Sequence, residues 1–118
     1  MPSLAITATI AAQTIATERK DARHKVRSIT IDNNGGAADQ EIEVVDSFTT
    51  DASVDGTTGA TEAAAAKTVT RWRDTVPAGF SATYNKEDLE GVECLGALTV
   101  KGDSDDTDCH ISVGYETV

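Results

Sequence analysis

Hydrophobic and polar side chains alternate along several segments of this chain. Three segments show the pattern clearly, and their apolar positions are Ile29 and Ile31; Ile42, Val44 and Phe48; and Cys109, Ile111, Val113 and Tyr115. Because successive side chains leave opposite faces of a pleated strand, such alternation is typical of strands with one buried face. The pattern predicts a single all-β domain over residues 1–118, an antiparallel β-sandwich or jelly roll of about eight short strands.

The first predicted hairpin joins residues 26–32 to residues 40–48. Its turn would be Asn33-Asn34-Gly35-Gly36, because Asn and Gly accept the positive φ that tight hairpin turns require. Turning the apolar positions of both segments to one side fixes the register, since a one-residue slip would expose them. The resulting pairs are Ile31 with Ile42, Ile29 with Val44, and Arg27 with Asp46.

A second predicted hairpin joins residues 92–101 to residues 109–118 around the acidic turn 102–108. The same reasoning pairs Val100 with Cys109, Leu98 with Ile111, Gly96 with Val113, and Cys94 with Tyr115. In this register Cys94 and Cys109 lie about three residue pairs apart, well beyond the ~7 Å between α-carbons that a disulfide spans. We therefore expect two small buried thiols, unless the two segments face each other across the sandwich.

Shorter elements are expected in the rest of the chain. Residues 4–17 are typical of one or two short strands, and residues 67–76 and 80–84 of one strand each. Between the last two strands, Val76-Pro77-Ala78-Gly79 fits a type I turn. Residues 85–91 would form a single helical turn that begins with an Asn cap and ends at a Gly.

The composition predicts a thin core. Leu, Ile, Val and Phe together contribute 23 of the 118 residues, whereas Ala and Thr contribute 17 each. A small domain with so little apolar surface gains stability by assembling with other chains. Residues 49–66 are expected to form a long loop of the kind that is usually functional or mobile. The apolar runs are too short and too often interrupted for a membrane span or a secretory leader.

The chain is strongly acidic, with 20 acidic and 10 basic side chains and a formal net charge of −10. Residues 1–27 are the exception, because they hold five bases and two acids. The overall balance argues against nucleic-acid binding, which requires a cationic face. This basic segment is either a solvated loop with edge strands or a docking arm for an acidic neighbour, such as a second copy of the chain. Its interface candidates are Arg19, Lys20, Arg23, Lys25 and Arg27.

No catalytic signature is present, so the sequence predicts no enzyme, no cofactor and no metal site. The two cysteines form no C-x-x-C motif, and no serine lies in a G-x-S-x-G elbow. His24 and His110 lack the spacing of zinc ligands and are expected on the surface. The four aspartates within 103–108 are hard oxygen ligands of the kind calcium prefers, but the glycine and the glutamate of an EF-hand are missing. A solvated turn is expected there.

Several short phrases of the chain resemble small β-rich structural proteins of tailed bacteriophages. They are KVRSITIDN (25–33), VVDSF (44–48), VPAG (76–79), LEGVECLGAL (89–98) and HISVGY (110–115), and together they cover roughly a third of the chain. The resemblance implies a virion component, a capsid decoration or cement protein that binds the major capsid protein or other virion proteins. Its localisation would be the virion. A small homo-oligomer, for example a trimer, would suit this role, and the resemblance assigns no functional residue.

The alternative function is a host- or glycan-binding module, such as the base of a fibre or a surface adhesin, with the 49–66 loop at the binding face. Trp72, flanked by Arg71 and Arg73, helps to separate the two hypotheses. An exposed tryptophan would favour binding, whereas a buried one would belong to the core.

Overall fold

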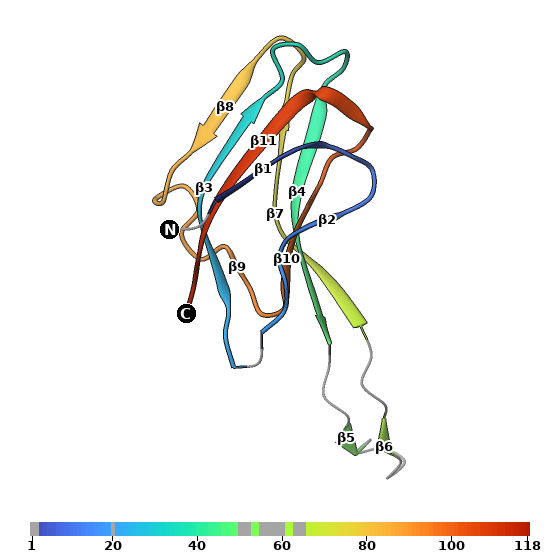
Figure 1. The fold of residues 1–118 in the computed structure, drawn as a ribbon, viewed down its shortest axis with the longest axis vertical. Coiled ribbons are helices and arrows are strands. Elements are labelled where there is room, and N and C mark those ends of the chain that lie inside the picture. Colours follow the sequence, from blue (N-terminus) through green and yellow to red (C-terminus); the bar gives the residue numbers. More distant parts are fainter. Residues whose placement is uncertain (1–2, 20, 50–52, 55–60, 63–65) are drawn as a thin grey trace.

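The computed structural model describes residues 3–19, 21–49, 53–54, 61–62 and 66–118. Most of these residues belong to two antiparallel sheets that pack face to face (Figure 1). Sheet A has the order β1 (Ser3–Ala8), β11 (Asp106–Thr117), β3 (His24–Asp32) and β8 (Ser81–Tyr84), and β9 (Glu93–Cys94) also pairs with β3. Sheet B has the order β2 (Gln13–Ala16), β10 (Ala97–Lys101), β4 (Gln40–Thr49) and β7 (Ala66–Val76). A separate two-stranded ribbon consists of β5 (Ser53–Val54) and β6 (Thr61–Glu62).

The predicted all-β sandwich is confirmed, with five strands in one sheet and four in the other. Strands pair in a nested order along the chain: β1 with β11, β2 with β10, β3 with β8, and β4 with β7. The chain therefore behaves as one long hairpin, wrapped so that its two halves form both sheets, which is the jelly-roll arrangement. The described part of the chain contains no helix that is long and apolar enough to cross a membrane.

This topology shows that both predicted hairpins are wrong, because β3 and β4 lie in different sheets, as do β10 and β11. In sheet A, Ile29 lies between Val113 and Tyr84, and Ile111 lies between Ile6 and Ile31. In sheet B, Val44 lies between Val100 and Trp72, and Leu98 lies between Ala16 and Asp46. All four side chains are nevertheless buried, as predicted. Alternation determines which face a strand buries, but it does not identify the strand beside it. The connections 33–39 and 102–105 cross the ~10 Å between the sheets instead of turning back within one sheet.

Aliphatic side chains from both sheets fill the space between them. The largest fully buried side chains are Ile29, Ile31, Ile42, Leu89, Leu98 and Ile111. Cys94 and Cys109 are free and fully buried, so the prediction of two buried thiols is confirmed. Their predicted register is wrong, because Cys94 lies on β9 and pairs with His24 of β3.

Four connections meet at one end of the sandwich, which we call the loop end: residues 9–12, 33–39, 77–80 and 102–105. Two buried amide side chains connect them. Asn33 donates through Nδ2 to the carbonyl oxygens of Ala38 and Val76, both at 3.0 Å. Gln40 donates through Nε2 to the hydroxyl of Ser104 at 2.7 Å. These bonds join the β3–β4 connection to its two neighbours at the loop end.

The two predicted turns have different outcomes. In the 77–80 connection a hydrogen bond to the carbonyl of Pro77 closes the turn, and Gly79 adopts a φ of +84° at its third position. That geometry fits a type II turn one residue later than predicted. After β8, the side chains and backbone N–H groups of Asn85 and Asp88 cap each other at 3.0 and 3.1 Å. The predicted capped turn is confirmed, and it ends at Gly91, whose φ is +85°.

Paired cysteine substitutions would test the strand order. Thr30 and Thr83 are exposed and directly opposite each other on β3 and β8, so Thr30→Cys with Thr83→Cys should form a disulfide under mild oxidation. Thr30→Cys with Glu43→Cys should stay reduced, although the rejected hairpin would place these two positions opposite each other. Non-reducing electrophoresis with peptide mapping distinguishes the outcomes. A disulfide in the second variant and not in the first would contradict the topology.

Candidate functional site

The opposite end of the sandwich, the arm end, carries the segments 17–23 and 85–96 and a continuation of two strands (Figure 1). β4 pairs with β7 as far as Thr49 and Ala66, whereas β10 borders β4 only as far as Ser47. Beyond Ser47 the sheet therefore consists of two strands only, and we call this part the β4–β7 extension. The extension consists of the pairs Phe48 with Lys67 and Thr49 with Ala66, and the β5–β6 ribbon lies beyond it at one end of the long axis (Figure 1).

The predicted 49–66 loop lies beyond the extension. Within it, Ser53 pairs with Glu62 and Val54 with Thr61, so part of the expected loop is a two-stranded ribbon. Most of its other residues lie outside the described part of the chain.

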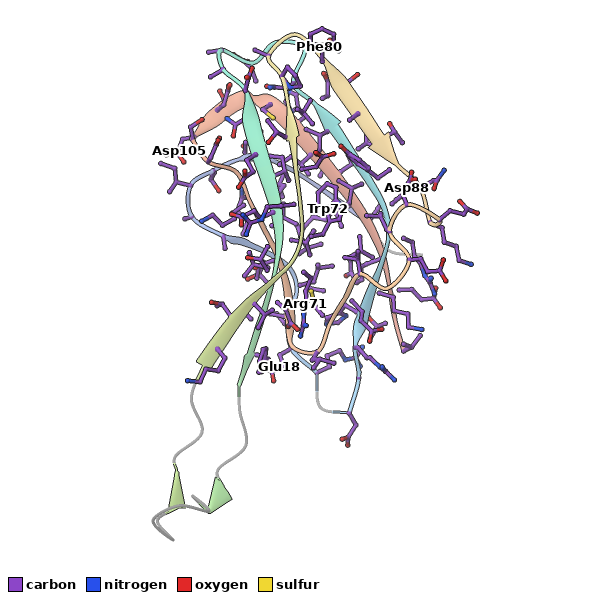
Figure 2. All side chains as sticks on the ribbon, turned by 180° about the vertical axis from the view of Figure 1, so that it is seen from behind. Glu18, Arg71, Trp72, Phe80, Asp88 and Asp105 are labelled. Carbon is purple, nitrogen blue, oxygen red and sulfur yellow. The ribbon has the colours of Figure 1, made fainter. Side chains whose placement is uncertain are left out.

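Asp46 forms a buried polar cluster where the β4–β7 extension leaves the sandwich. Its carboxylate is fully buried and accepts two hydrogen bonds from Arg71, at 3.0 Å from Nε and 2.7 Å from Nη2. Arg71 is labelled in Figure 2. The backbone N–H groups of Leu95 and Gly96 donate to the same carboxylate, both at 2.9 Å. Four donors thus compensate a charge that would be costly to bury alone. The cluster connects β4, β7 and the segment between β9 and β10.

Arg71 reaches Asp46 because it is the extra residue of a β-bulge in β7. Val44 pairs with Trp72 and Val45 with Thr70, which leaves Arg71 without a partner on β4. A bulge redirects a side chain, and this one directs the guanidinium toward the inward face of β4. The predicted pairing of Asp46 with Arg27 is therefore wrong. Arg27 donates instead to the carboxylate of Glu116 at 2.9 Å.

The described cations of the basic segment lie in the 17–23 segment at the arm end and in β3, and two of them are engaged within the chain. Arg23, directly before β3, contacts Glu93 of β9 at 3.1 Å, and Arg27 of β3 contacts Glu116 of β11. Of the other candidates, Arg19 is exposed, Lys25 is half-buried, and Lys20 lies outside the described residues. Neither Arg19 nor Lys25 forms an ion pair with another residue that the structure describes, so both are available to a partner.

A groove of about 460 Å³ lies beside the basic segment, between β3 and the turn at 85–91. Val26 and Leu89 form its buried apolar part. Lys86 and Glu87 stand among the charged residues of both signs that also line it. No aromatic side chain lines the groove, so it offers no platform for stacking a sugar or a base. The groove gives no indication of a particular small ligand.

His24 is buried, contrary to the expected surface position. Only 2% of it is exposed. Nε2 donates to the carbonyl oxygen of Thr17, and Nδ1 is hydrogen-bonded to the hydroxyl of Thr117, both at 2.8 Å. The inward-facing positions of β3 include His24 because the alternation that buries Val26 continues toward the start of the strand. His110 is exposed on sheet A, as predicted.

Two of the four aspartates within 103–108 bind backbone groups of neighbouring connections. Asp105 accepts a hydrogen bond from the N–H of Ile10 at 2.8 Å, and Asp106 accepts one from the N–H of Ala37 at 3.1 Å (Figure 2). These bonds join three connections of the loop end. Among the residues that the structure describes, no group of three or more His, Cys, Asp or Glu side chains is placed to hold a metal ion.

Trp72 lies half-buried against the core rather than on an exposed binding face. Its ring meets that of Tyr84 edge to face, with centroids 4.9 Å apart. The hydroxyl of Tyr84 donates to the carboxylate of Asp74. These contacts close one side of the sandwich between β7 and β8, so Trp72 belongs to the core.

The two cysteines are poorly suited to nucleophilic chemistry. Burial raises the pKa of Cys94 to about 12, and the nearby Asp46 carboxylate adds to this effect. Burial, with a contribution from Asp106, raises the pKa of Cys109 to about 11. Because the thiolate is the nucleophile, both side chains are unreactive thiols at neutral pH.

Comparison with known proteins leaves the chain without an assigned family. No family model matches it, and no curated protein and no solved structure matches it significantly. The function is therefore inferred from the features of the chain itself.

Substitution of Asp46 would test the polar cluster. Asp46→Asn removes the negative charge and presents an amide N–H₂ to groups that can only donate, so we expect the free energy of unfolding to fall by roughly 2–4 kcal/mol. Glu43→Gln is the matched control on the same strand, because its nearest cations lie at 3.6 and 3.8 Å on the surface. The control substitution should lower the free energy of unfolding by only about 0–1 kcal/mol. Equal losses in urea unfolding would contradict the role of the cluster.

The buried thiols predict a loss of stability at high pH. In the unfolded chain a cysteine has its ordinary pKa of 9.0, whereas the folded values are about 12 and about 11. Deprotonation therefore favours the unfolded chain, and the free energy of unfolding should fall as the pH rises above 9.0. Replacing Cys94 and Cys109 by Ala should flatten the decline that urea unfolding measures. Some dependence of the unfolding free energy on pH should remain, because the pKa of Tyr84 is also raised, to about 12. If the double substitution leaves the pH dependence unchanged, this account is wrong.

Proposed function

We propose that the chain is a structural protein of a tailed-bacteriophage virion. It would be a decoration or cement protein that attaches to the outside of the head by binding the major capsid protein or another virion protein. The observation that carries the proposal is the β4–β7 extension. An isolated two-stranded ribbon is marginally stable at best in water, and beyond Ser47 no third strand among the described residues borders this one. A neighbouring subunit packed against the extension would supply the missing contacts.

The surface of sheet A also favours contact with other proteins. One outward row across it consists of Ala5, Ser112, Thr30 and Thr83. A second row consists of Thr7, His110, Asp32 and Ser81. In a chain with a net charge of −10, these rows contain one carboxylate and few bulky side chains. Such a face can approach a neighbouring protein closely without strong charge repulsion.

The jelly-roll architecture is compatible with the proposal, since viral capsid domains use it, but lectins and other proteins use it as well. Architecture alone therefore does not decide the function. The phrases that resemble phage structural proteins add support, because two of them lie in β3 and β11, at the centre of sheet A. The alternative, a glycan-binding module, gains nothing from Trp72, whose ring packs against Tyr84.

Co-sedimentation would test the proposal. The purified chain should pellet with assembled heads of the phage that encodes it, up to a fixed ratio of chains to capsid subunits. Replacing residues 48–67, which include the extension, by an Asn-Gly turn between Ser47 and Thr68 should abolish this binding while the sandwich remains folded. Full head binding by the shortened chain would contradict the role of the extension, and no binding by the intact chain would contradict the proposal.

The basic segment is expected to orient the attachment. Replacing Arg19, Lys20 and Arg23 by Gln should weaken head binding at low salt, because exposed ion pairs select partners and orientation although each contributes only about 0–1 kcal/mol. The matched control replaces Arg73, Lys86 and Lys101 by Gln, which changes the net charge equally. Unchanged binding at low salt, or the same loss in both variants, would contradict a specific role for the segment.

A further inference from the structure

We propose that Asn34 is a site of spontaneous deamidation, in which the backbone nitrogen of Gly35 closes a succinimide ring on the Asn34 side chain. The chain contains three asparagines, and Asn34 is the one followed by glycine. A glycine in the next position leaves its nitrogen sterically open to the side-chain carbonyl carbon. The proposal is independent of the virion role.

The surroundings of Asn34 and Gly35 leave both reacting groups accessible. Both residues are exposed in the connection between β3 and β4. Within the described part of the chain, the Gly35 N–H donates no hydrogen bond and the Asn34 carboxamide has no partner. The Asn34 backbone is anchored only through its own N–H, which donates to Asp32 at 3.1 Å. Two successive glycines follow, so the backbone has the freedom to bring the Gly35 nitrogen to the side chain.

The other two asparagines lack these properties. Asn33 is fully buried, and its Nδ2 donates to two carbonyl oxygens, so its carboxamide is held in place. The nitrogen that would have to attack it belongs to Asn34 and is already bonded to Asp32. Asn85 is followed by Lys86, and its Oδ1 accepts a hydrogen bond from the N–H of Asp88 at 3.0 Å. Both residues therefore serve as internal controls.

The reaction requires only water as a co-reactant. The Gly35 nitrogen loses its proton to solvent and attacks Cγ of Asn34; the new N–Cγ bond forms as the Cγ–Nδ2 bond breaks, and the amide leaves as ammonia. Water then opens the cyclic imide at one of its two carbonyl carbons. Opening at Cγ gives an ordinary aspartate at this position, and opening at the main-chain carbonyl carbon gives an isoaspartyl linkage. Either product carries one new carboxylate, and the chain gains one mass unit.

The product adds a negative charge to an end of the molecule that is already acidic. The loop end and its borders contain Asp32, Asp39, Asp103, Asp105, Asp106 and Asp108, and the stretches 32–40 and 102–109 contain no lysine or arginine. The isoaspartyl form also lengthens the backbone of the connection between the sheets. Asn33 and Gln40 anchor this connection on either side of the modified residue, so the change stays local and the sandwich remains folded.

Peptide mapping by mass spectrometry tests the proposal on the intact folded chain. During incubation for weeks at physiological pH and temperature, the peptide containing Asn34 should gain one mass unit at least an order of magnitude faster than the peptide containing Asn85. Fragmentation should place the change at Asn34 rather than Asn33. Methylation by an isoaspartyl methyltransferase should label the same peptide, which distinguishes the isoaspartyl product.

Gly35→Ala supplies the matched variant. A Cβ at this position would meet no atom closer than 3.5 Å, so the variant should fold normally while the added methyl group slows ring closure. Thermal unfolding of the variant checks its fold. Conversion of Asn34 no faster than that of Asn85 would overturn the proposal, as would conversion of Gly35→Ala at the original rate. The proposal would also be overturned if Asn34 deamidated far more slowly in the folded chain than in the urea-unfolded chain, since the fold would then protect Asn34.

Discussion

Inward-facing aliphatic side chains of both sheets hold the sandwich together. Ile29, Ile31 and Ile111 of sheet A belong to the same buried cluster as Ile42 and Leu98 of sheet B. Complete burial of each such side chain contributes about 1.5–3 kcal/mol. The core contains few large side chains, since Leu, Ile, Val and Phe contribute only 23 of the 118 residues. Buried polar groups lie at both ends of the sandwich.

The two ends are closed by buried polar side chains with several hydrogen bonds each. At the loop end, the amides of Asn33 and Gln40 connect three neighbouring segments. At the arm end, the carboxylate of Asp46 collects four donors from Arg71 and from the backbone of residues 95–96. Buried networks of this kind rigidify a structure and specify a unique arrangement, and here Oδ1 of Asn33 is the one buried side-chain oxygen or nitrogen among the described residues that has no partner. They compensate here for a core that has few large side chains.

The faces of the strands were predictable from the sequence, but their partners were not. The alternation around Ile29 and Ile111 correctly indicated which side chains are buried, because the period of a strand is a local property. The partner of each strand depends on how the whole chain wraps, and nothing within residues 26–48 reveals that the 33–39 connection crosses between sheets. The type of fold was therefore predicted, and both hairpins were wrong.

The predicted partner of Asp46 was an arginine, but the wrong one, Arg27 instead of Arg71. Asp46 occupies an inward-facing position in line with Ile42 and Val44, and an acid at such a position signals a buried partner. The identity of that partner, Arg71, depends on a bulge in β7 that strand propensity does not reveal. His24 was misplaced for a related reason. The alternation of Ile29 and Ile31 would place it outside, but a bulge at Arg27 changes the parity of β3, so that Val26 and His24 face inward.

The β4–β7 extension links the fold to the proposed function, because it is built as part of a sheet yet has no third strand in the described chain. A three-dimensional reconstruction of the virion of the phage that encodes the chain tests this link most directly. The account predicts jelly-roll density on the outside of the head, with a neighbouring subunit packed along the extension. Absence of the chain from the virion, or an extension surrounded only by solvent, would contradict it.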